Sequence, residues 1–351
     1  MKLGIGAAAF GPKAQINLDL IRRAEALGFD SAWTAEAYGN DAVTTATWVA
    51  AHTKTLMVGT SIMQMPARTP AMTAMTAMTL DHLTGGRFIL GLGPSGPQVV
   101  EGWHGVPYGK PLTRTREYVQ ILRQIFAREK PLEFHGEIYD IPTHAPGASG
   151  LGKPLKSILH GNPNIPIYTA SISPNGLRCA GEVADGVFPM MMDPDKAGET
   201  YIPYIEQGFA KAAQADGRKK TLADFAIVPG VSVIVSDEIE KARMPVKGGL
   251  ALYIGGMGAR DKNFYNDLAR RLGFEEAAVK IQDLFLAGKK MEAAMAVPDE
   301  LVDAVHLVGP KARIRDRLSA WKQAGKRGHV HTLLVQTGQV EALELLAEEL
   351  L

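Results

Sequence analysis

The stretch GTSIMQMPARTP, residues 59–70, comes at the point where a strand ends and the chain should turn. It follows the apolar pair Met57-Val58 and mixes small polar residues with methionines. A helical pattern follows over about 70–83, and then GRFILGLG, residues 86–93, has the composition of a buried strand. A strand, an irregular segment, a helix and a strand in this order are typical of a parallel βαβ unit. We therefore interpret residues 59–70 as a strand end whose side chains face a ligand rather than a core.

The same alternation of short apolar strands and helices runs through the whole chain, which indicates an α/β fold with a parallel sheet. Eight such units in 351 residues suit one closed (β/α)₈ barrel domain, residues 1–351, of the TIM-barrel type. The strand candidates lie near residues 3–5, 31–34, 57–63, 86–93, 165–171, 185–191, 224–235 and 330–335.

Two segments interrupt the alternation. Residues about 130–163 are rich in Pro and Gly and contain a hairpin pattern, LEFHGEIYDIP, and residues about 237–300 form an irregular helical region. We interpret them as insertions after strands four and seven, and we expect both to cover the pocket.

Composition and charge exclude several classes of protein. The chain is 46% hydrophobic and 21% charged with a formal net charge of +1, so there is no strong electrostatic case for nucleic acid or an anionic membrane as a partner. The single cysteine, Cys179, excludes an intrachain disulfide and a cysteine-based metal cluster, and it fits a reducing cytoplasm. Pro12 and Lys13 end the short apolar N-terminal stretch, so we expect no signal peptide, and no apolar run is long enough to predict a membrane span.

The sequence GLGPSG, residues 91–96, matches the G-x-G-x-x-G pattern of dinucleotide-binding loops and follows a strand. Pro94 and Pro97 argue against a helix that begins at the last glycine, and no acidic residue ends a second strand about 20 residues further on. We therefore interpret these glycines as positions where the backbone approaches a flat ligand closely. The histidines show no metal-ligand spacing, so we expect no metal site.

Polar residues follow several of the predicted strands, and in a barrel of this kind the site lies at those strand ends. Glu36 and Tyr38 follow the second strand, where a carboxylate can orient a ring N–H or act as an acid or base, or be only a solvated loop carboxylate. His104 lies beside the fourth strand end and can donate a proton, although a lone histidine is more often structural.

The segment ASISPNG, residues 170–176, predicts a helix start. Ser173 is a good N-cap and Pro174 suits the first helical position. The free N–H groups there and the hydroxyls of Ser171 and Ser173 form an anion site, unless the segment is only an ordinary capped helix. Met72, Met75 and Met78 recur with a period of three, and we interpret them as core residues.

Four segments together resemble the bacterial luciferase-like monooxygenase superfamily. More narrowly, they resemble its branch of oxidoreductases that use the deazaflavin coenzyme F420, which includes methylenetetrahydromethanopterin reductase. The segments are LIRRAEALGFDSAWTAEAYGND (20–41), VGTSIMQMPARTPAMTAMTAMTLDHLTGGRFILGLGPSGPQVVEGWHG (58–105), AGEVADGV (180–187) and LVGPKARIRDRLSAWKQAG (307–325).

The resemblance implies F420 as the cofactor, with FMN as the alternative. It also implies a non-prolyl cis peptide between Ser61 and Ile62, at the end of strand three, that packs against the middle ring of the cofactor. The expected catalytic residues are Glu36 and His104. The residues expected to bind the cofactor are Glu36, Thr60, Ser61, Ile62, Gly93, Ser95, Gln98, Ala170, Ser171, Ser173 and Gly176.

One position departs from the family pattern. Members that oxidise sugars or alcohols carry a histidine directly after the acid, and this chain has Ala37 there. The departure argues against alcohol oxidation with that residue as the base. The reaction that we expect is hydride transfer between deazaflavin C5 and a small organic substrate, with Glu36 or His104 as the acid. An FMN-dependent monooxygenase and a non-catalytic cofactor-binding protein remain alternatives. The resemblance also implies a homodimer or higher homo-oligomer, for which the Ala-rich helices after strands two and three offer an interface.

Overall fold

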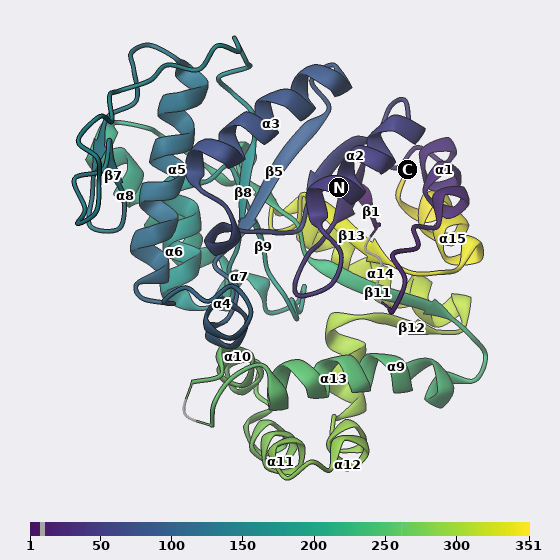
Figure 1. The fold of residues 1–351 in the computed structure, drawn as a ribbon. Coiled ribbons are helices and arrows are strands. Elements are labelled where there is room, and N and C mark those ends of the chain that lie inside the picture. Colours follow the sequence, from purple (N-terminus) through teal and green to yellow (C-terminus); the bar gives the residue numbers. More distant parts are fainter. Residues whose placement is uncertain (8–10, 261) are drawn as a thin grey trace.

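A parallel sheet forms the centre of the computed structural model, which describes residues 1–7, 11–260 and 262–351 (Figure 1). The strands pair in the order β10-β9-β8-β5-β3-β2-β1-β13-β11, and every pair along this path is parallel. These strands are β1 (Lys2–Gly6), β2 (Ser31–Thr34), β3 (Met57–Thr60), β5 (Phe88–Gly93), β8 (Ile167–Ala170), β9 (Gly186–Phe188), β10 (Ala226–Ile227), β11 (Gly230–Val235) and β13 (Thr332–Gln336).

The sheet curls until its two ends meet. Only residues 228–229 separate β10, which pairs with β9, from β11, which pairs with β13. The N–H of His331 donates to the carbonyl of Ile227 at 2.9 Å, and the N–H of Leu334 donates to the carbonyl of Pro229 at 3.0 Å, so this chain segment joins both edges. The predicted α/β fold with a parallel sheet curled as in a TIM barrel is confirmed, and the single strand predicted over residues 224–235 is divided into β10 and β11.

The helices that follow the barrel strands pack on the outside of the sheet (Figure 1). Most of them are amphipathic, so their apolar faces cover the strands. They are α1 (Leu18–Ala26), α2 (Ala42–His52), α3 (Pro70–Thr84), α5 (Pro111–Ala127), α6 (Pro174–Val183), α8 (Ile202–Asp216), α14 (Lys311–Lys326) and α15 (Val340–Leu350). Shorter turns are η1 (Met65–Ala67), α4 (Pro97–Gly102), α7 (Ala197–Thr200) and η2 (Leu222–Asp224).

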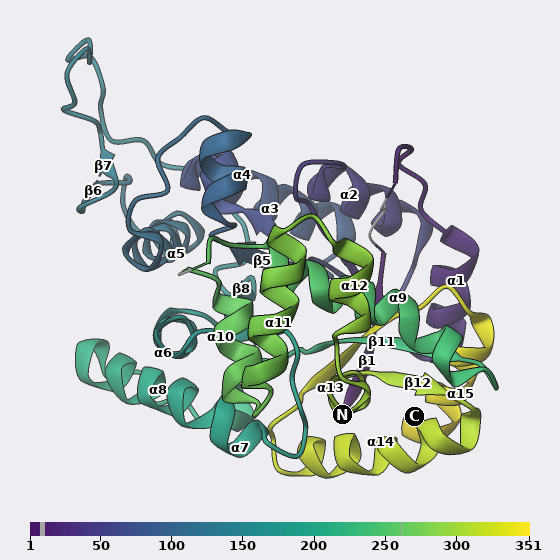
Figure 2. The ribbon, with the colours of Figure 1, turned by 90° about the horizontal axis from the view of Figure 1, so that it is seen from below.

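Further elements lie outside the barrel path. β4 (Met63–Gln64) pairs with β5, β12 (Leu307–Gly309) pairs with β11, and β6 (Phe134–His135) pairs antiparallel with β7 (Asp140–Ile141). Figure 2 shows the β6–β7 hairpin projecting away from the barrel, whereas the helical segment between β11 and β12 lies across the barrel end near α4. That segment holds α9 (Ile239–Ala251), the π-helix η3 (Leu252–Gly256), α10 (Phe264–Arg271), α11 (Glu275–Leu286), α12 (Lys290–Met295) and α13 (Asp299–Val305).

Large aromatic side chains fill the barrel interior. The ring of Trp33 packs on Tyr168 with ring centroids 5.9 Å apart and edge-on to Phe188 at 5.1 Å. Gly59 makes room for this indole, because a Cβ at that position would lie 2.3 Å from the Trp33 ring. The interior is therefore a packed core, and any ligand must bind at its end.

Two local predictions were wrong. A short helix, α4, does begin directly after Gly96, because Pro97 occupies the first helical position, where its missing N–H costs nothing. Met72 and Met75 are 52% and 55% exposed, and only Met78 is buried. A spacing of three moves about 60° around a helix at each step, so Met72 and Met78 lie about 120° apart, and only Met78 falls on the buried face.

Candidate functional site

The loops after β2 and β3 are joined at the barrel end. The N–H of Ser61 donates to the carbonyl of Thr34 at 2.6 Å, and the N–H of Glu36 donates to the carbonyl of Ile62 at 3.3 Å. The peptide bond between Ser61 and Ile62 is cis, as the resemblance implied. Both residues are half-buried, so this segment is accessible at the strand end.

The glycines of β5 allow this segment to pack closely. A Cβ on Gly91 would lie 1.7 Å from the carbonyl oxygen of Thr60, and a Cβ on Gly93 would lie 2.7 Å from the Ile62 side chain. The Thr60 hydroxyl donates to the Gly91 carbonyl at 2.8 Å and accepts from its N–H at 3.0 Å. These glycines thus allow the end of β3 to approach β5 closely. Thr60, which the resemblance placed among the cofactor-binding residues, is fully buried in this packing.

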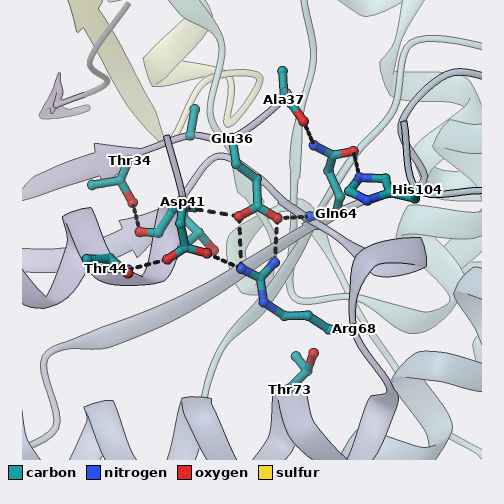
Figure 3. Close-up of polar contacts among 12 residues, drawn as sticks. Thr34, Glu36, Ala37, Asp41, Thr44, Gln64, Arg68, Thr73 and His104 are labelled. Carbon is teal, nitrogen blue, oxygen red and sulfur yellow. Dashed lines mark hydrogen bonds and ion pairs between the residues drawn. The ribbon is translucent and has the colours of Figure 1, made fainter. Parts of the chain in front are cut away.

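An ion-pair network surrounds Glu36 (Figure 3). Arg68 donates to both carboxylate oxygens, at 2.5 and 3.1 Å, and the N–H groups of Gln64 and Ala42 donate to them at 2.7 and 3.0 Å. The Glu36 side chain is 7% exposed, and Arg68 also pairs with Asp41. Because four donors hold this carboxylate, the geometry favours a positioning role for Glu36 over proton transfer.

Sequence reasoning missed Arg68, although it lies in the stretch of residues 59–70. Burial alone would lower the pKa of its guanidinium, but the hydrogen bond to Glu36 and the charges of Glu36 and Asp41 outweigh burial and raise it. Asp41 is also the N-cap of α2, since its carboxylate accepts the N–H of Thr44 at 2.6 Å. The network therefore ties the loop after β2, the loop after β3 and the start of α2 together.

His104 is connected to the same loops through Gln64. The Gln64 amide donates to the carbonyl of Ala37 at 2.5 Å, so its oxygen is the atom that faces Nε2 of His104 at 3.1 Å (Figure 3). His104 must then carry a proton on Nε2. Its Nδ1 has no hydrogen-bond partner in the part of the chain that the structure describes, and the ring is half-buried.

The end of β8 forms a polar corner. Ser173 caps α6, and its hydroxyl accepts the N–H of Gly176 at 3.1 Å, as predicted. Arg271, from α10, donates from Nη2 to the carbonyl of Ile172 at 2.6 Å, and its buried Nε has no partner among the described residues. A helix N-terminus, the hydroxyl of half-buried Ser171 and a guanidinium with an unused N–H together favour an anion. Sequence reasoning missed Arg271, which is 99 residues from Ile172.

The sheet order brings the predicted positions to one edge. Because β3, β5 and β8 are neighbours, Ile62, Gly93 and Ala170 follow one another along the barrel end. Ser95 has a left-handed φ of 59°, its carbonyl accepts the hydroxyl of Tyr108 at 3.4 Å, and Gln98 is exposed on α4. The structure thus brings the predicted residues together along β3, β5 and β8.

The polar residues described above lie at one end of the barrel, where the strands end. The sequence also matches one family along nearly its whole length. The model of the luciferase-like monooxygenase family matches residues 3–328, so the chain belongs to this family of enzymes. None of the helices in the described part of the chain is long and apolar enough to cross a membrane.

Three similar proteins indicate which branch of this enzyme family the chain resembles. A Mycobacterium tuberculosis protein named "Putative coenzyme F420-dependent oxidoreductase Rv3520c" is 42% identical over 349 residues, 99% of this chain and 98% of that protein. The 5,10-methylenetetrahydromethanopterin reductase of Archaeoglobus fulgidus is 28% identical, with 94% and 93% covered. The solved structure of the coenzyme F420-dependent tetrahydromethanopterin reductase from Methanopyrus kandleri aligns with a TM-score of 0.76 over 99% of this chain and 97% of that one, at 24% identity, and shares the fold.

Proposed function

We propose that this chain is an F420-dependent oxidoreductase that moves a hydride between the deazaflavin ring and a small organic substrate. The observation that carries the proposal is the row of strand ends from Ser61 and Ile62, through Gly93, to the polar corner at Ser171 and Arg271. The name of the 42% identical relative supports it. When bound, F420 supplies the hydride chemistry, and the protein supplies binding, orientation and proton control.

Each part of the row has a proposed role. Ser61 and Ile62 would support the ring system of bound F420, and Ser95 and Gln98 would hold the polyol chain that F420 carries. The N-terminus of α6 would hold the phosphate of the cofactor. The residues there are Ala170, Ser171, Ser173, Gly176 and Arg271. A Cβ on Gly176 would lie 3.0 and 3.1 Å from the hydroxyls of Ser173 and Ser171, so the glycine keeps close contacts to both.

His104 is the proposed proton donor or acceptor through Nδ1, while Gln64 holds the ring by Nε2. Glu36 acts through Gln64 and Arg68 as a positioning residue. With Ala37 in place of histidine, the chain has no base at that position, which favours substrates with an electrophilic carbon over alcohols.

The helical segment over the barrel end supplies aromatic side chains for the substrate. The rings of Tyr253 and Tyr265 are 4.8 Å apart, and burial raises the pKa of both hydroxyls, which stay neutral. We infer that this segment, residues 237–300, and residues 130–163 are insertions in the barrel. Only the first is proposed to cover the site, because the β6–β7 hairpin of the second projects away from the barrel (Figure 2).

Titration of the purified protein with F420 and, separately, with FMN tests the proposal, with tryptophan fluorescence as the readout. We expect tight binding of F420 and weak binding of FMN. Arg271→Ala should weaken F420 binding at least tenfold. The matched control is Arg260→Ala, which removes an exposed arginine that pairs with Asp283 in the same segment. Preference for FMN would favour the monooxygenase alternative, and binding of neither would refute the cofactor assignment.

We also propose a homodimer through α2 and α3, and a cytoplasmic location for the chain. These neighbouring helices expose large apolar side chains, which a second copy of the chain would cover. They are Trp48, Met72, Met75 and Leu83. Light scattering at micromolar concentration should give the mass of a dimer, and Met75→Glu should shift it to that of a monomer. A monomeric mass for the unmodified protein would reject the proposal.

A further inference from the structure

Three potential metal ligands meet on the β6–β7 hairpin, far from the barrel end. Nδ1 of His135 lies 2.6 Å from Oδ1 of Asp140, and Nδ1 of His144 lies 3.0 Å from Oδ2 of the same carboxylate. One ligand atom from each residue lies within 4.8 Å of the others. The two imidazole rings are 5.8 Å apart between centroids. Sequence reasoning found no metal-ligand spacing among the histidines, but the structure brings these three residues together.

The hairpin explains why the spacing was not recognised. His135 and Asp140 are cross-strand partners in the antiparallel register, and the chain then turns so that the N–H of His144 donates to Asp140 at 2.6 Å. The ligand set comes from the register of two short strands and a turn. A search for two histidines on one helix, or for paired cysteines, does not detect it.

We propose that His135, Asp140 and His144 bind one divalent transition-metal ion of the Zn²⁺ class. Two imidazole nitrogens and a carboxylate oxygen are a common three-ligand set for Zn²⁺, with water as the fourth ligand. Bonds of about 2.0–2.1 Å in a tetrahedron place ligand atoms about 3.3 Å apart. The two nitrogen–oxygen distances here, 2.6 and 3.0 Å, are hydrogen-bond distances, so the two rings would have to move slightly outwards to admit the ion. The histidine side chains are 58% and 75% exposed, so an ion can enter from solvent without opening the core.

The ion would connect the two strands of the β6–β7 hairpin at the end opposite the turn, because the turn itself is already bound to the barrel. Glu117, on α5, accepts the N–H groups of Glu137, Ile138 and Tyr139 at 2.7, 2.9 and 3.0 Å. This contact anchors the turn to the barrel. At the opposite end the chain leaves β7 for a long segment without regular structure, residues 142–166. A metal bond between His135 and His144 ties the start of that segment back to β6.

The test uses the full-length, tag-free protein after treatment with a chelator. Zn²⁺ is titrated by calorimetry, and Co²⁺ is titrated by its visible absorption, which reports tetrahedral coordination. We expect one ion per chain, with affinity at least tenfold weaker in His144→Ala and in Asp140→Asn. His160→Ala is the matched control, because it removes an exposed histidine from the same segment outside the cluster.

A second readout is limited proteolysis of the segment after β7. Zn²⁺ should slow cleavage within residues 142–166 in the unmodified protein and in His160→Ala, and it should have no effect in His144→Ala. Equal Zn²⁺ affinity in all variants would overturn the proposal, as would the absence of stoichiometric binding. In either case the cluster is only a hydrogen-bonded triad. F420 binding by His144→Ala should be unchanged, which separates this test from that of the proposed function.

Discussion

Replacing Arg68 by methionine should destabilise the protein through the carboxylate that it leaves behind. Met keeps most of the length and apolar contact of the arginine but removes the charge and the hydrogen bonds. The Glu36 side chain is 7% exposed in the unmodified protein. In the variant it would keep only the N–H groups of Ala42 and Gln64 as donors. Asp41 would also lose its partner, but it is 41% exposed and can turn to water.

The expected cost follows from the burial of each group. Breaking a buried ion pair from one side costs about 3–5 kcal/mol, because an uncompensated charge remains in a low-dielectric site. Arg68 is itself 19% exposed, so water can partly replace it. We therefore expect Arg68→Met to lower the free energy of unfolding by about 2–4 kcal/mol. Glu36→Gln should cost about 2–3 kcal/mol, because its amide group would place N–H donors against other donors.

The double variant distinguishes this reasoning from simple loss of contacts. With Glu36→Gln and Arg68→Met together, the only carboxylate left without Arg68 is Asp41, which is 41% exposed, so no buried unpaired charge remains in this network. The cost should therefore fall below the sum of the single variants by at least about 1 kcal/mol. Denaturant unfolding measures all three. Arg23→Met is the matched control, since its pair with Glu344 is about half exposed on both sides and should be worth at most about 0.5 kcal/mol. Additive costs, or a cost for Arg68→Met no larger than for the control, would refute the reasoning.

Three further predictions concern the barrel end and the stability of the fold. Gly91→Ala should cost about 3 kcal/mol or more in thermal or denaturant unfolding, since its Cβ would meet the backbone of Thr60, whereas Gly39→Ala has open space and should be near neutral. His104→Gln should slow turnover about 100-fold while F420 affinity stays within twofold, and equal turnover would remove His104 from the mechanism. Burial lowers the pKa of His306 from 6.5 to about 4, so the neutral imidazole is the folded form. The contribution of this group to the free energy of unfolding is complete above pH 6.5 and is lost as the pH falls towards 4. We expect the loss to be about 1–3 kcal/mol, less than for a ring sealed in the core, since His306 also lines a surface hollow. His306→Gln should make stability less dependent on pH in this range, as measured by denaturant unfolding.

Local patterns in the sequence were sufficient for the barrel and for parts of the site. Short apolar strands alternate with helices, and this pattern predicts a parallel sheet because each strand must be covered on both faces. Ser173 and Pro174 predicted the start of α6, since capping depends only on residues within one turn. The position of the cis peptide, between Ser61 and Ile62, came from the family resemblance and not from any local pattern.

The tertiary structure alone decided which polar groups meet. Arg68 reaches Glu36 across 32 positions of sequence, and Arg271 reaches Ile172 across 99. The packing of β3 on β5 buried Thr60, which the sequence had placed among the cofactor-binding residues. Periodicity and capping are set by neighbours along the chain, so a sequence shows them. The partner of a charged side chain is set by which strand ends the closed sheet brings together, and that depends on the packing of the whole barrel.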